Sequence, residues 1–249
     1  MPRGPGASAR GKGPRAGMAV ALVAAALSAC PAAAEVSPAS EPTAPVARVE
    51  RAASIVADVL DRYLAHPSYS IRFVQESYWA LADTVKETAG VLLVEGSGRL
   101  SLEYADGGRA VADGETLRVF VPETRQFFVT ALDPADIAVD PARILAAYEP
   151  DRRAPIVGDD DGPAITIGMR PRERYGEPAR IEATVDRNSL ELVGLVAFSS
   201  TGDRTTYRIT ETRFDVETSD QDFKLPRPEG AELIRGSPFG APGASAGMD

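Results

Sequence analysis

The chain has 249 residues and a formal net charge of −9, and it contains a single cysteine and a single histidine. An acidic chain is a poor match to nucleic acid, whose phosphates attract basic patches, and to anionic lipid surfaces. One cysteine excludes a disulfide bond within the chain, so stability must come from a packed core.

The first 34 residues have the pattern of an export signal. Four basic residues precede the apolar stretch 16–29, which is too short for a stable membrane-spanning helix, and no acidic residue occurs before Glu35. Ala32-Ala33-Ala34 fits a cleavage site that would make Glu35 the first mature residue. Removal of 1–34 takes away four basic residues, which leaves 23 basic against 36 acidic residues and a net charge of −13.

The segment around Cys30 allows a second interpretation. Leu27-Ser28-Ala29-Cys30 resembles a bacterial lipobox, in which Cys30 would be lipidated and become the first residue. In the competing interpretation, Cys30 is discarded with the signal. The residues leave both open, and the two differ in location: a soluble periplasmic protein, or one anchored in a membrane through Cys30.

One domain is predicted over 49–235, between a Pro/Ala-rich linker at 35–48 and a Gly/Ala/Ser/Pro-rich tail at 236–249 that is predicted to be disordered. It begins with a helix over 49–64, because apolar residues recur there at the i, i+3, i+4, i+7 spacing. Pro67 ends this helix. A helix with one apolar face needs a partner surface to bury that face.

Further along, Asp140-Pro141 places a capping carboxylate before a proline, which predicts a short helix that contains Ile144, Leu145 and Tyr148. Asp133-Pro134 is expected to start a similar single turn that ends near Ile137. Short apolar helices among strands are usually packing elements. The alternative is a lid, which would be functional.

The rest of the domain reads as strands whose side chains alternate, such as Leu100, Leu102 and Tyr104 against Arg99 and Glu103. Successive strand side chains face opposite sides, so this predicts an antiparallel sheet with one apolar and one wet face. Short Gly- and Asp-containing turns separate the strands. The predicted ranges are 68–79, 87–95, 98–105, 109–113, 116–122, 125–131, 163–170, 178–187, 190–200 and 203–217.

Residues able to do chemistry are scarce. His66 stands alone beside a proline at the end of the first helix, and no His/Cys cluster has the spacing of metal ligands. Asp159-Asp160-Asp161 offers oxygen ligands for Ca²⁺, but a solvated acidic loop is the simpler interpretation. An enzyme that uses this loop is therefore the weaker hypothesis, and no cofactor or metal is predicted.

Apolar side chains, in contrast, are abundant. Three helical segments are few to cover about ten strands, so the sheet either curls around a filled core or encloses a cavity. A filled core would suit a scaffold module without a ligand. A cavity would suit a binder of acyl chains, since each buried methylene contributes about 0.8 kcal/mol.

Several stretches, taken in order, resemble a known family over roughly Val49 to Ile234: the periplasmic outer-membrane lipoprotein carrier family, LolA. The stretches are Phe73-Val74-Gln75-Glu76, Gly90-Val91-Leu92-Leu93-Val94, Gly98 to Tyr104, Val111 to Phe120, Asp140-Pro141 with Ile144-Leu145, Ile165-x-Ile167-x-Met169-x-Pro171, and Phe223 to Gly230.

The resemblance implies a mainly β, α+β fold: an unclosed antiparallel half-barrel whose helices form a lid over a hydrophobic cavity. It also implies a soluble monomeric carrier without a cofactor. Such a carrier takes triacylated lipoproteins from an inner-membrane lipoprotein-releasing ABC transporter and gives them to an outer-membrane acceptor. An acceptor of the same fold, lipidated at Cys30, is the alternative.

The residues expected to line the acyl-chain cavity are Leu92, Val94, Leu100, Leu102, Tyr104, Val119 and Phe127, and those expected in the lid are Ile144, Leu145 and Tyr148. A register error of one residue would move each strand residue to the other face. The chain departs from the family at Gly96-Ser97, where the family has Arg-Pro, and at Leu100 and Leu102, where it has aromatic residues. The arginine thought to help hold the lid is therefore missing.

Overall fold

The computed structural model describes residues 44–96, 98–132, 140–158, 161–173 and 178–236, which belong to one compact unit. The expected signal, most of the linker, nearly all of the tail, Asp159, Asp160 and the turn expected after Asp133 lie outside the described residues. In the part of the chain that is described, no helix is both long and apolar enough to cross a membrane.

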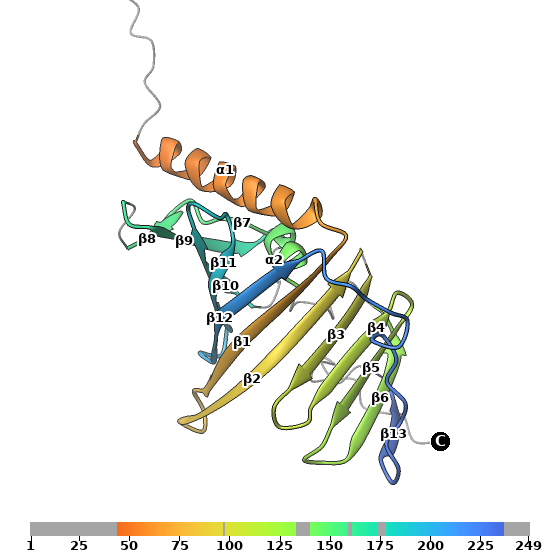
Figure 1. Ribbon diagram of the computed structural model, residues 1–249. Coiled ribbons are helices and arrows are strands. Elements are labelled where there is room, and N and C mark those ends of the chain that lie inside the picture. Colours follow the sequence, from red (N-terminus) through yellow and green to blue (C-terminus); the bar gives the residue numbers. More distant parts are fainter. Residues whose placement is uncertain (1–43, 97, 133–139, 159–160, 174–177, 237–249) are drawn as a thin grey trace, which may run out of the picture. The chain divides into compact units, whose positions relative to one another are not determined.

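The first helix, α1, spans Ala44–Leu64 and therefore begins inside the segment expected to be linker. A proline in the first turn is compatible with a helix, because the first N–H groups have no intrahelical acceptor. Half of the apolar stripe is buried, because Ala52, Val56, Val59 and Tyr63 are each at most 5% exposed, whereas Leu64 at its C-terminal end is exposed. Their spacing of four, three and four residues places them on one side of α1, which packs on the sheet (Figure 1).

The ten expected strands are confirmed. They are β1 (Ser68–Trp79), β2 (Thr84–Glu95), β3 (Arg99–Tyr104), β4 (Arg109–Asp113), β5 (Thr116–Val121), β6 (Gln126–Ala131), β9 (Ala164–Pro171), β10 (Arg180–Asp186), β11 (Leu192–Phe198) and β12 (Arg204–Phe214). Three short strands were not expected: β7 (Tyr148–Pro150), β8 (Ile156–Val157) and β13 (Glu232–Arg235).

These strands form one open sheet in the order β13-β6-β5-β4-β3-β2-β1-β12-β11-β10-β9-β7, with β8 paired to β9 (Figure 1). Neighbouring strands are antiparallel except β13, which is parallel to β6. Strands β13 and β7 are the two ends of this order, so the sheet does not close on itself. The expected fold, a mainly β unclosed half-barrel with a few helices, is confirmed.

One face of the sheet, here called the inner face, carries the main core. Its residues come from alternate positions of the strands, as in Tyr69, Ile71 and Phe73 of β1, and pair across the sheet with Val94 and Leu92 of β2. Helix α1 and the short helix α2 (Pro141–Ala147) bury their apolar sides in the same core. The sheet therefore supplies one wall of the core and the two helices supply the other.

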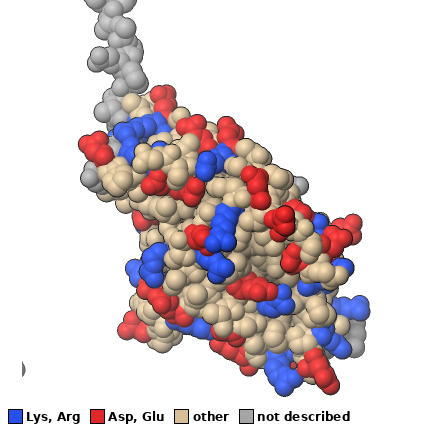
Figure 2. Space-filling model, viewed as in Figure 1, with Lys and Arg blue, Asp and Glu red and all other residues tan. Residues whose placement is uncertain are grey.

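The opposite, outer face is not uniformly wet as the alternation predicted. Over β1, β2 and β12 it carries ion pairs such as Arg72–Glu211 and Arg208–Glu87, and both signs of charge are interspersed over the view in Figure 2. Over β4 to β6, however, it carries a second apolar cluster. That cluster contains Val111, Phe127, Phe223, Leu225 and Ala231, with Leu93, Phe120 and Val129 packed against it.

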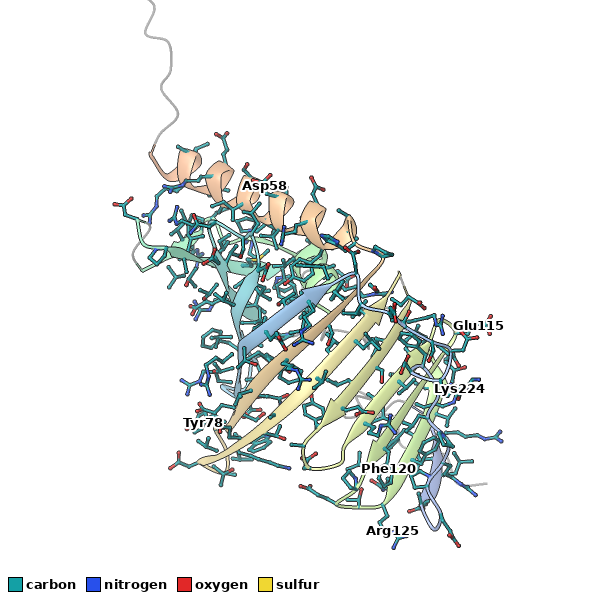
Figure 3. All side chains as sticks on the ribbon, viewed as in Figure 1. Asp58, Tyr78, Glu115, Phe120, Arg125 and Lys224 are labelled. Atoms are coloured by element: carbon teal, nitrogen blue, oxygen red, sulfur yellow. The ribbon has the colours of Figure 1, made fainter. Side chains whose placement is uncertain are left out.

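Residues 215–231, here called the strap, run from β12 to β13 and supply three of the five buried residues of this second cluster. Phe223 is 1% exposed and lies under the Arg99 guanidinium, which is 4.3 Å from the ring centre. Arg99 also binds Asp220 of the strap at 2.8 Å. Figure 3 labels Lys224 of the strap and Phe120 of β5 in this half of the sheet. The strap thus covers outer-face apolar side chains that would otherwise face water.

We expect Phe223→Ala to lower the free energy of unfolding by about 3 kcal/mol, because it removes a buried ring from a closely packed cluster. Urea denaturation gives the value. Leu81→Ala is the control: Leu81 is fully exposed, so the loss there should stay below about 0.5 kcal/mol. Equal small losses in both variants would mean that the strap is not part of the cooperative fold.

Candidate functional site

Helix α2 lies over the inner face, and its local sequence explains its position. Asp140 has extended backbone angles and accepts a hydrogen bond from the Ala142 N–H at 3.0 Å, so it is the N-cap, and Pro141 occupies the first turn. The helix ends where Tyr148 becomes extended and starts β7. Between these two ends, Ile144 and Leu145 are buried against the sheet.

A small apolar cavity of about 30 Å³ lies between α2 and the inner face. Its lining comes from β1, β2, β11, β12 and α2: Ile71, Phe73, Leu92, Pro141, Ile144, Leu192, Leu195, Tyr207 and Ile209. This space has room for about one water molecule. The structure is therefore a closed state, and a ligand as long as an acyl chain fits only if α2 moves away from the sheet.

Two aromatic rings, Phe73 and Tyr207, line this cavity on the inner face, and the ring of Tyr104 contacts Phe73 beside it. Phe73 meets Tyr104 and Tyr207 edge-on, with ring centres 5.9 and 5.6 Å apart. The Phe73 ring lies on Gly90, where an added Cβ would come within 2.5 Å of the ring. Burial raises the pKa of Tyr207 to about 12. The Tyr104 hydroxyl donates to Gln75 at 3.0 Å, so its polar tip is satisfied.

A buried polar contact, here called the latch, ties α2 to the sheet. The Tyr69 hydroxyl of β1 donates to Oδ1 of Asp140, the N-cap of α2, and Arg143 Nε lies 3.5 Å from Oδ2. Burial raises the pKa of Asp140, against the lowering effects of the Tyr69 hydroxyl, the Ala142 N–H and the Arg143 charge. Burial and the Asp140 carboxylate raise the pKa of Tyr69, which keeps its proton and remains a donor.

A second and larger pocket, here called the mouth pocket, lies where the C-terminal end of α1 approaches α2. Its volume is about 460 Å³. It is lined by Leu60, Tyr63, Leu64, His66, Pro67, Tyr69, Gly96, Asp140, Ala142, Arg143 and Ala146. His66 pairs with Asp215 at 2.9 Å and stacks on Phe214. The mouth pocket therefore combines apolar walls with the latch and the His66–Asp215 pair.

The structure brings together most of the residues expected in the cavity. Leu92 and Ile144 line it directly, Val94, Leu100, Leu102 and Leu145 are buried in the same core, and Tyr104 and Val119 are partly buried against that core. Tyr148 is also in this core, but in β7 rather than in α2. No bound ligand tests any of these roles, so they remain expectations.

The prediction for Phe127 is wrong, because this side chain lies in the second cluster on the outer face. Phe127 pairs with Phe120, whereas Phe128 pairs with Val119 of the inner face. The run Phe127-Phe128-Val129 is apolar on both faces, so its alternation is ambiguous. The prediction also missed the other seven lining residues: Ile71, Phe73, Pro141, Leu192, Leu195, Tyr207 and Ile209. Of these, Tyr207 and Ile209 alternate with Thr206 and Arg208 and were detectable.

Among the described residues, no cluster of three or more His, Cys, Asp and Glu side chains has the geometry to hold a metal ion. The site is thus a small apolar compartment covered by α2, with the latch and the mouth pocket beside it. Such an arrangement can bind and release an apolar ligand.

The family model of the outer membrane lipoprotein carrier protein LolA matches residues 66–226, more than half of the chain. A search of curated proteins found no match.

Solved structures align at low identity. An uncharacterised conserved protein from Thermus thermophilus has a TM-score of 0.47 and 13% identity, over 74% of this chain and 98% of its own. A LolA superfamily protein from Nitrosomonas europaea has a TM-score of 0.42 and 12% identity, over 70% of this chain and 97% of its own. A chain of the Pseudomonas aeruginosa MucA/MucB complex has a TM-score of 0.40 and 17% identity, over 71% of this chain and 61% of its own.

We expect Tyr69→Phe to loosen α2 by removing the latch hydrogen bond. The free energy of unfolding should fall by about 1–2 kcal/mol, because the Asp140 carboxyl loses a buried partner. Hydrogen exchange should accelerate at the amides of Ile144 and Leu145. Tyr207→Phe is the matched control, since its hydroxyl makes no hydrogen bond to α2 in the described part of the chain. Unchanged exchange in Tyr69→Phe would contradict the latch.

Asp140→Asn should change how stability depends on pH. The folded pKa of Asp140 is raised above the usual 3.8, so above that pH the folded chain holds a proton that the unfolded chain has lost. The wild-type free energy of unfolding therefore falls as pH rises through this range. Asn still caps α2 and does not titrate, so the variant should gain stability relative to wild type above pH 3.8. The free energy of unfolding is measured with urea at several pH values. A constant difference between wild type and variant across these pH values would contradict the prediction.

Proposed function

The chain belongs to the outer membrane lipoprotein carrier protein LolA family, and we propose that it carries lipoproteins between the two membranes of the cell envelope. The acyl chains of the client lie in the compartment between α2 and the inner face. An inner-membrane lipoprotein-releasing ABC transporter is the donor and an outer-membrane acceptor is the recipient. The observation that carries this proposal is the cavity of nine apolar and aromatic residues under a short, separately latched helix.

The free energies of exposing α2 and of burying an acyl chain favour opening of the compartment when such a client is present. Exposing Ile144 and Leu145 costs about 3–6 kcal/mol, and breaking the latch hydrogen bond costs about 1 kcal/mol more. Burying one acyl chain of about fourteen methylenes contributes about 11 kcal/mol at 0.8 kcal/mol each. One chain therefore outweighs the cost of displacing α2, while an empty carrier stays closed and keeps its apolar surface from water.

The location follows from the same role. A carrier must leave the membrane, which favours removal of residues 1–34 as a signal and Glu35 as the first mature residue. The alternative is an outer-membrane acceptor of the same fold that is lipidated at Cys30. The mass of the mature N-terminus distinguishes them: a free Glu35 supports the carrier, and a lipidated Cys30 supports the acceptor.

The test of binding uses a charge placed on the inner face. Ile209 lines the cavity and is partly exposed, so Ile209→Glu is compatible with folding, but the carboxylate would have to be desolvated beside an acyl chain. We expect it to weaken the binding of a triacylated lipopeptide at least tenfold in a fluorescence titration. Lipoproteins that co-purify with the wild-type protein from periplasm, identified by mass spectrometry, should be absent with this variant.

Arg208→Glu is the matched control, because Arg208 precedes Ile209 on β12 and its side chain is on the exposed outer face. Its affinity should stay within about twofold of wild type. Equal loss in both variants would show that the effect is not specific to the inner face. Absence of saturable binding by the wild-type chain would overturn the proposal in favour of a scaffold with a filled core.

A further inference from the structure

The mouth pocket differs from the cavity under α2 because it already has the volume for a ligand in the closed state: about 460 Å³ against about 30 Å³. Its apolar walls come from Leu60 and Leu64 of α1 and from Ala142 and Ala146 of α2. Pockets with mostly apolar walls and a few polar groups are where small ligands bind. The polar groups of this pocket therefore indicate which ligand it fits.

Besides the hydroxyls of Tyr63 and Tyr69, the pocket has two pairs of acidic and basic side chains that line it or face it. His66 lies in the pocket wall and is paired with Asp215, and Asp140 is occupied by the latch. Arg143 contacts Asp140 only through Nε, at 3.5 Å. Its two terminal amino groups have no hydrogen-bond partner within the described residues, although only 25% of the side chain is exposed. Arg143 is thus a half-buried donor with unused capacity.

The two pairs also set the charge of the ligand. Arg143 is balanced by Asp140, and His66 is paired with Asp215, so the pocket has no excess of positive charge. An anionic group bound to Arg143 would lie near the Asp140 carboxylate, which repels it. A neutral group rich in carbonyl oxygens accepts hydrogen bonds from the guanidinium without this repulsion.

The mouth pocket and the cavity are contiguous along two elements. On β1, Tyr69 lines the mouth pocket, while Ile71 and Phe73, the next positions on the same face, line the cavity. On α2, Arg143 lines the mouth pocket and its neighbour Ile144 lines the cavity. From Tyr69 to Phe73 the strand rises roughly 13 Å. One elongated amphiphile can therefore place its head in the mouth pocket and its tail along β1.

We propose that the mouth pocket binds the neutral, carbonyl-rich head group of an acylated ligand, with Arg143 as the donor. For a triacylated lipoprotein, these acceptors are the ester and amide carbonyls that join the acyl chains to the N-terminal residue. This inference rests on the proposed function, because the tail occupies the compartment under α2. It assigns the head group to a preformed site and leaves only the tail to displace the lid.

The experiment compares three probes on the mature chain and on Arg143→Met: a triacylated lipopeptide, palmitate, and hexadecanol, which has the tail without a carbonyl. Loss of a hydrogen bond from a charged donor should weaken lipopeptide binding about 10- to 100-fold. Hexadecanol binding should change by less than about twofold. A larger loss for palmitate than for the lipopeptide would overturn the neutral head group in favour of an anion.

Because Arg143→Met also removes the partner of Asp140, a second variant tests the pocket without touching that pair. Ala146 lines the mouth pocket and is exposed, so Ala146→Trp should fill the pocket without disturbing the core. It should weaken lipopeptide binding at least tenfold and spare hexadecanol. If the lipopeptide and hexadecanol both bind wild type, and neither variant weakens lipopeptide binding more than hexadecanol binding, the head-group site is wrong and the carrier function stands. If no probe binds the wild-type chain, the head-group site and the proposed carrier function are both wrong.

Discussion

The fold depends on one requirement: the apolar inner face of an open sheet must be kept from water without closure of the sheet. Helix α1 contributes four side chains to this cover that are at most 5% exposed. Helix α2 has only seven residues, and its large side chains Ile144 and Leu145 are buried in the same core. Displacing a cover of this size costs less free energy than burying an acyl chain contributes.

The latch explains how the closed state is held in this chain. By its resemblance to the lipoprotein carriers, the chain has Gly96-Ser97 where the family has Arg-Pro, so the arginine thought to hold the lid is missing. Gly96 instead lines the mouth pocket, together with Tyr69, Asp140 and Arg143. A hydrogen bond from Tyr69 to the cap of α2 therefore links sheet and lid within the same pocket. Arg143 belongs both to the latch and to the proposed head-group site, so the proposal couples ligand entry to release of α2.

Much of the fold could be predicted from the sequence, because the alternation in β1 to β6 and β9 to β12 and the stripe in α1 are set by local periodicity. The failures have physical causes. Strands β7, β8 and β13 have only two to four residues, and their pairing depends on the rest of the sheet. Phe127 was assigned to the wrong face because the strap buries an outer-face cluster, which no local pattern in β6 reveals. The latch joins Tyr69 to Asp140, residues far apart in the sequence, so only the fold could show it.

The central claim is that an acyl ligand displaces α2 from the inner face. Electron-spin distance measurement tests it directly, with one label at exposed Ala147 of α2 and one at Arg208 on the outer face of β12, and Cys30 replaced by serine. Addition of a triacylated lipopeptide should shift the distance distribution to a new, resolved population that disappears when the ligand is removed. Saturable binding of the lipopeptide with an unchanged distribution would contradict the claim, because the closed cavity of about 30 Å³ cannot hold the chain.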